Sequence, residues 1–205
     1  QGPEGEVTAT NQDTDKPDMT TTTFLRLVLD YADDLDEAVE IAQSYDMHDS
    51  AGTSYHYMVA DASGRSAIFE WVAADDDTDT DGSARELRVT YNDDDAAFGE
   101  VEAAADYQWV TNFVLEPNFY ASDDAKKGLD RYNELYTRLS ATDGIVADES
   151  AAMDVLAAVG RRSWNNDDAN TITVHSVVYN LTDRVMYWVP NENFDDASAW
   201  ITYKL

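Results

Sequence analysis

The chain has 205 residues, a formal net charge of −29 and 43% hydrophobic residues, values that fit a folded domain with a buried core. Only 13 lysines and arginines are present, which argues against nucleic-acid binding and a polybasic membrane contact. No apolar run approaches the roughly 20 residues that cross a bilayer, and without cysteine the chain has no disulfide or thiolate.

The first part of the chain predicts a loop and then two helices. Residues 1–18 are polar and contain glycine and proline, so we expect a loop or an edge strand there, with at most a short strand at 7–10. The Thr20–Thr23 run offers hydroxyls that can cap a helix, and apolar residues follow at helical spacing. A second helix is predicted over 35–44, capped by Asp33 or Asp34.

The apolar period then changes from 3.6 to 2, which favours strands. Two strand-like runs, 55–60 and 65–72, are joined by Asp61-Ala62-Ser63-Gly64, a sequence that suits a tight hairpin turn. The remaining predicted elements are two strands, two helices and three strands, over 86–91, 107–110, 129–139, 149–159, 171–179, 184–189 and 199–203. Helix pairs between runs of antiparallel strands indicate the α+β class, and we expect one domain spanning 1–205.

Two motifs suggest binding or modification, and each has a simpler explanation. Asp77–Gly82 places carboxylates at alternate positions before a glycine, as in the first half of a calcium loop, but Arg88 stands where the final glutamate belongs. A solvated hairpin loop is the alternative. Asn180-Leu181-Thr182 fits a glycosylation sequon and also fits the turn between two strands, which we favour.

The three histidines, His48, His56 and His175, are too scattered for metal-ligand spacing. His175 and Ser176 are neighbours in a predicted strand, so their side chains point to opposite faces and cannot act on each other as base and nucleophile. We therefore expect neither a metal nor a cofactor.

Asn112 and Arg131 are the candidates for catalysis. Asn112 follows a predicted strand and precedes an apolar run, so its amide NH₂ could stabilise an oxyanion at the edge of a cleft, although Asn also caps turns readily. Arg131 stands at the start of a predicted helix, where a cation interacts unfavourably with the helix dipole. An arginine at this position therefore needs another reason. That reason is either a functional role or a surface ion pair with Asp130.

Five motifs, in the same order along nearly the whole chain, resemble the choloylglycine hydrolase and penicillin acylase family. They are Leu29-Asp30-Tyr31-Ala32 with Glu37-Ala38-Val39, the hairpin from Tyr55 to Glu70, Val110-Thr111-Asn112, Asp130-Arg131-Tyr132, and His175-Ser176-Val177-Val178-Tyr179-Asn180. The family counterparts of the last three are Leu-Thr-Asn, Ser-Arg-Phe and Trp-Ser-x-Val-Tyr-Asp.

This resemblance implies an N-terminal-nucleophile hydrolase with a four-layer αββα fold that cleaves linear amide C–N bonds. In that family a mature N-terminal cysteine is the nucleophile, and its own α-amine is the general base. Asn112 matches the oxyanion asparagine and Arg131 the late arginine, at a shorter interval than in bile-salt hydrolases. Because the chain has no cysteine, we interpret it as the C-terminal portion of such an enzyme.

Several expectations follow from this interpretation. The substrate is a small N-acyl amide of the bile-salt, penicillin V or another class, and the chain alone is inactive. Its partners are the missing N-terminal segment of the same enzyme or a second copy of the chain, because a partial sandwich leaves apolar surface uncovered. We expect a cytoplasmic rather than an extracellular location. The alternative function is a secreted acidic β-rich module that binds calcium through Asp77–Gly82.

Overall fold

The computed structural model describes residues 9–52, 54–73, 81–93, 107–116, 119, 126–163 and 172–205. The chain divides into two compact units, Gln1–Leu129 and Asp130–Leu205. Each unit has its own three-stranded antiparallel sheet and its own cluster of buried apolar residues. The expectation that these units form one domain stays a prediction.

The two N-terminal helices form where the sequence predicts them. Helix α1 (Thr21–Tyr31) is capped by Thr20, and α2 (Leu35–Gln43) is capped by Asp34, whose carboxylate accepts a hydrogen bond from the Glu37 amide at 3.0 Å. Each cap satisfies one of the backbone amides that a helix leaves unpaired in its first turn.

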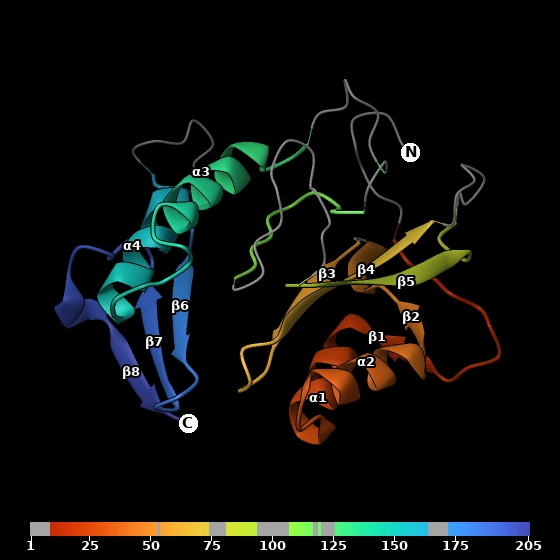
Figure 1. Ribbon diagram of the computed structural model, residues 1–205. Coiled ribbons are helices and arrows are strands. Elements are labelled where there is room, and N and C mark those ends of the chain that lie inside the picture. Colours follow the sequence, from red (N-terminus) through yellow and green to blue (C-terminus); the bar gives the residue numbers. More distant parts are fainter. Residues whose placement is uncertain are drawn as a thin grey trace. The chain divides into compact units, whose positions relative to one another are not determined.

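The first sheet is made of β3 (His56–Ala60), β4 (Ser66–Ala73) and β5 (Arg85–Tyr91), in that order. The predicted hairpin turn is confirmed: the Asp61 amide donates to the Arg65 carbonyl at 3.0 Å, and Gly64 has a φ of 90° that favours glycine. Helices α1 and α2 cover one face of this sheet (Figure 1).

Aromatic rings form the core between this sheet and its helices. The Phe24 ring lies 4.9 Å from that of Tyr57 and 5.8 Å from that of Trp71, both edge-to-face, and 5.9 Å from that of Phe69. The alternation of β4 places Phe69 and Trp71 on this face. The alternate positions of β4, which include Glu70, therefore lie on the opposite face of the sheet.

A parallel pair of short strands, β1 (Asp18–Thr20) and β2 (Asp46–His48), was not predicted. Each has three residues, too few to show a period, and their pairing joins positions far apart in sequence. Buried Gln12 links this pair to the first sheet, because its amide donates to the Arg85 carbonyl at 2.6 Å and accepts from the Met47 amide at 3.0 Å. The strand predicted at 7–10 falls partly outside the described residues, and positions 9 and 10 are not in a strand.

The second unit contains α3 (Leu129–Ser140), which begins at the boundary, α4 (Glu149–Val159) and three strands. The strands are β6 (His175–Asn180), β7 (Val185–Pro190) and β8 (Ile201–Lys204), paired in chain order. Strand β8 begins two residues later than predicted, because residues 197–199 form a short 3₁₀ turn capped by Asp196. The turn interpretation of Asn180 is confirmed, since its side chain accepts from the Asp183 amide at 2.9 Å.

The sheet of the second unit buries one face against α4. Met153, Val189 and Phe194 form its buried cluster. On the opposite face, Tyr179 and Tyr203 are 55% and 45% exposed.

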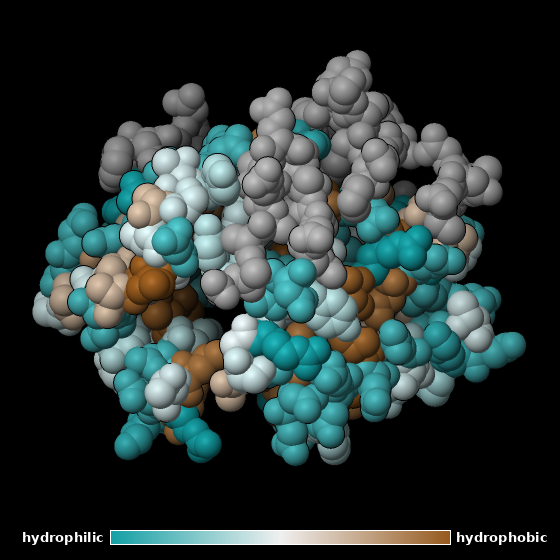
Figure 2. All heavy atoms as spheres, in the orientation of Figure 1, coloured by the Kyte–Doolittle hydropathy of each residue, from teal (hydrophilic) through white to brown (hydrophobic). Residues whose placement is uncertain are grey.

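In the part of the chain that the structure describes, no helix is long and apolar enough to span a bilayer. Hydrophilic side chains cover much of the surface in view, as the strong negative charge requires (Figure 2).

Candidate functional site

The segment 107–116, which carries Asn112, covers the face of the first sheet opposite α1 and α2 (Figure 1). The prediction of a strand at 107–110 is wrong. Side-chain hydrogen bonds hold the segment in place of strand pairing: Gln108 donates to the Thr90 carbonyl at 2.8 Å and accepts from the Ser66 hydroxyl at 2.9 Å. Trp109, Phe113 and Leu115 are buried and exclude water from this face.

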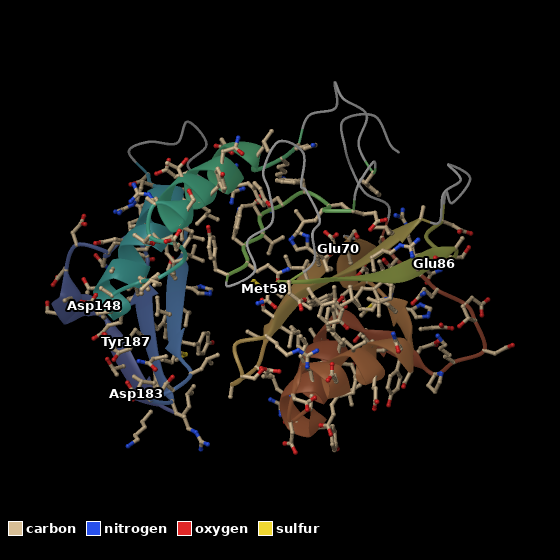
Figure 3. The ribbon with its side chains drawn as sticks, viewed as in Figure 1. Met58, Glu70, Glu86, Asp148, Asp183 and Tyr187 are labelled. Carbon is tan, nitrogen blue, oxygen red and sulfur yellow. The ribbon has the colours of Figure 1, made fainter. Side chains whose placement is uncertain are left out.

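Glu70 is the buried charged residue at the centre of this contact (Figure 3). It lies in the middle of β4, with only 2% of its surface exposed. Both carboxylate oxygens accept from the backbone amide of Leu115, at 2.9 and 3.0 Å. A buried carboxylate without partners is strongly destabilising, so this amide helps to make the burial of Glu70 possible.

His56 supplies the second partner of Glu70. It stands directly opposite Glu70 in the strand register, and its Nδ1 lies 3.2 Å from Glu70 Oε1. Its other ring nitrogen, Nε2, lies 2.6 Å from the carbonyl oxygen of Thr111. One imidazole therefore connects the buried carboxylate to the backbone beside Asn112.

The proton positions follow from these contacts. A carbonyl oxygen only accepts, so Nε2 carries the hydrogen in the bond to Thr111. Nδ1 and Oε1 then attract each other only with one more proton between them, as an imidazolium–carboxylate pair or as a neutral imidazole with a protonated acid. In both forms, His56 and Glu70 make one connected hydrogen-bond network from Thr111 to Leu115.

Arg88 adds a weaker contact at the end of the same row. It pairs with Glu70 in the register of β4 and β5, and its Nε lies 3.7 Å from a carboxylate oxygen of Glu116. Both side chains are partly exposed, so this ion pair contributes little stability. Three neighbouring residues from three strands thus contact the segment at 111, 115 and 116.

Asn112 lies in a bend between the contacts that His56 and Glu70 make, one residue after Thr111 and three before Leu115. It does not end a strand, in contrast to the prediction, because the segment crosses the sheet face instead of joining its edge. Its side chain is exposed, whereas the neighbouring Phe113 is 4% exposed. An amide group on a backbone fixed at both sides can be held in one orientation.

Arg131 is the third residue of α3, in the second unit. Burial lowers the pKa of its guanidinium, the positive charge of Arg161 lowers it further, and the charge of Asp130 opposes both. The group stays protonated, as guanidinium groups do in proteins. Asn112 belongs to the first unit and Arg131 to the second, and a shared site for the two stays a prediction.

The sequence model of the acyl-coenzyme A:6-aminopenicillanic acid acyl-transferase family matches residues 10–194. The chain belongs to this family. Among curated proteins, no significant match was found.

Solved structures show that this acyl-transferase family member shares its fold with a known hydrolase. Two of them are variants of the conjugated bile acid hydrolase from Clostridium perfringens, with TM-scores of 0.60 and 0.56 and identities of 14% and 16%. The alignments cover 99% of this chain, and 67% and 72% of those chains. The predicted α+β fold of the N-terminal-nucleophile hydrolases and the predicted family resemblance are confirmed.

Within the described residues, the other motifs of this family member give no further site. Residues 77–80 of the proposed calcium loop lie outside the described residues, and the Asp81 carboxylate accepts from the amide and hydroxyl of Ser83. The Nδ1 atom of His48 lies at hydrogen-bond distance, 2.8 Å, from Oδ1 of Asn11. The exposed His175 lies beside the Trp188 ring. No group of three His, Asp or Glu side chains within the described ranges is arranged to hold a metal ion.

Sequence reasoning did not identify Glu70 and His56 as parts of the site. One signal was present, because Glu70 is the only charged residue in the run Ala67-Ile68-Phe69-Glu70-Trp71-Val72. A charge in such a run needs a buried partner. That partner, the Leu115 amide, is 45 positions away and has no side-chain signature.

Proposed function

We propose that this chain is part of an amide hydrolase that cleaves the linear C–N bond of small N-acyl amides. Family membership over residues 10–194 and the fold shared with a bile acid hydrolase support an acyl-transfer reaction. The observation that carries the proposal is the position of Asn112, an exposed residue on a backbone held at 111 by the partly buried His56 and at 115 by the buried Glu70.

Asn112 has the role of oxyanion donor in this proposal. Attack on an amide carbonyl produces a tetrahedral intermediate whose oxygen becomes an anion. A neutral NH₂ held about 3 Å from that oxygen stabilises it with little reorganisation. The buried Phe113 next to it reduces competition from water on one side.

Arg131 is assigned to substrate binding on separate grounds. A half-buried guanidinium near the start of a helix is unfavourable both for its solvation and for the helix dipole. A bound carboxylate or amide oxygen would add a charge-assisted hydrogen bond to this guanidinium. Arg131→Lys should then raise KM more than it lowers kcat, because lysine keeps the charge but loses the planar fork.

The nucleophile in this proposal comes from a segment outside the 205 residues, which contain no cysteine. The test compares the full gene product with the 205-residue chain on penicillin V and glycine-conjugated bile salts, following release of the amine. We expect turnover by the full product, loss of that turnover after thiol alkylation, and none by the chain alone. Thiol-independent turnover by the chain alone would contradict the proposal.

The partner we propose is the segment that supplies the nucleophile, with a second copy of the chain as the alternative. Light scattering of the chain with and without that segment distinguishes the two. A chain that remains a monodisperse monomer in the presence of the segment would contradict the first.

A further inference from the structure

We propose that Glu70 and His56 are positioning residues that hold the backbone on both sides of Asn112 and so orient its amide toward the reacting carbonyl. This inference rests on the proposed function for the role of Asn112, whereas the anchoring itself rests on geometry alone. Neither residue is expected to touch the substrate.

The anchoring acts at two backbone atoms. The Glu70 carboxylate holds the Leu115 amide at 2.9 and 3.0 Å, and His56 Nε2 holds the Thr111 carbonyl at 2.6 Å. The two side chains bond to each other at 3.2 Å, and the register of β3 and β4 fixes them opposite each other. The bend at Asn112 is therefore tied to the most buried strand of the first sheet.

Burial makes this connection strong. Glu70 is 2% exposed and the side chain of His56 is 20% exposed, so water competes poorly for either contact. A loop whose backbone bonds only to exposed groups samples several conformations. A donor in such a loop has to reorganise as charge develops, and a fixed donor does not.

Two substitutions at the same position separate the hydrogen bonds from packing. Glu70→Gln keeps the size, and after a small rotation that turns its NH₂ away from the Leu115 N–H, its single amide oxygen accepts from that N–H while the NH₂ donates to His56 Nδ1. Glu70→Leu keeps most of the volume but leaves the Leu115 amide and His56 Nδ1 without this partner. Phe69→Leu is the matched control, because Phe69 is equally buried but faces the helices.

Hydrogen exchange of the peptide containing residues 111–115, measured in the full gene product, tests the anchoring without reference to activity. We expect slow exchange in the wild type and in Glu70→Gln, and exchange faster by 10-fold or more in Glu70→Leu. Phe69→Leu should lower the melting temperature without selectively exposing this peptide. Equal protection of the peptide in the wild type and in Glu70→Leu would overturn the anchoring.

Kinetics test the consequence for Asn112, with rates expressed per active site titrated. Glu70→Leu should lower kcat by about 10- to 100-fold, a fraction of the loss for a missing oxyanion donor, with KM changed less than threefold. Glu70→Gln should restore kcat to within about threefold of the wild type. Wild-type kcat in Glu70→Leu would overturn the positioning role, because a merely structural role lowers only the folded fraction.

Failure of the proposed function would look different. A wild-type product that turns over no N-acyl amide contradicts that function and, with it, the orientation of Asn112 for catalysis. The exchange experiment still decides whether Glu70 anchors the segment. An active wild type with an unprotected peptide contradicts this inference alone.

Discussion

The two sheets have the same layout, three antiparallel strands in chain order, and differ in burial. The central strand of the first sheet, β4, is buried at seven of its eight positions. The central strand of the second sheet, β7, is buried at one position, Val189. Within its own unit, the first sheet is covered by helices on one face and by segment 107–116 on the other.

This difference determines what a polar residue on each sheet can mean. On the second sheet, an exposed polar atom can bond to water, so its presence does not indicate a partner within the protein. On β4, water is excluded, and Glu70 has to be satisfied by the protein. A charged residue on the sheet covered on both faces therefore indicates a specific contact within the protein. For Glu70, that contact connects the sheet to the segment that carries the candidate oxyanion donor.

The largest expected effect is a loss of stability in the first core, and it tests the difference in burial between the two units. Phe24→Ala removes a ring that contacts three aromatic residues, and it should lower the free energy of unfolding by about 3–5 kcal/mol. The matched variant Met153→Ala in the smaller second core should cost about 2 kcal/mol, because fewer buried groups surround it. Urea denaturation measures both, and equal losses would contradict the difference between the cores.

The next effect is catalytic and belongs to the first unit. Asn112→Ala in the full gene product should lower kcat by roughly 10²–10³-fold, about 2.7–4 kcal/mol of transition-state stabilisation, with a modest change in KM. Its melting temperature should change little, since the side chain is exposed. If kcat stays near normal, or activity is lost only through unfolding, Asn112 is a turn residue and the site assignment fails.

Local signals in the sequence predicted much of the fold. The caps Thr20 and Asp34 are each contained within one helical turn, and so are readable from neighbouring residues. The strands β1 and β2 depend on pairing between residues 28 positions apart, with no local period. The strand prediction at 107–110 is wrong because the alternating apolar residues of segment 107–116 cover a sheet face without joining the sheet.

The alkaline stability of the first unit gives a smaller effect. Burial raises the pKa of Tyr57 to about 12, whereas the unfolded chain ionises it near 10. Between these values the folded state retains a proton that the unfolded state loses, so the free energy of unfolding falls as pH rises from about 10 to 12, by up to roughly 2–3 kcal/mol. Tyr57→Phe should reduce this slope in urea denaturation. An unchanged slope would exclude Tyr57 as its source.

The smallest effect is expected on the half-exposed face of the second sheet. Tyr179 pairs with Met186 in the register of β6 and β7, yet 55% of its surface is exposed. Tyr179→Thr removes a ring that gains little from burial and introduces a residue with a good strand propensity. The free energy of unfolding should therefore change by less than about 0.5 kcal/mol. Urea denaturation of the chain measures this change, and a loss above about 1.5 kcal/mol would mean that this face is covered in solution. The contrast between the two sheets would then fail.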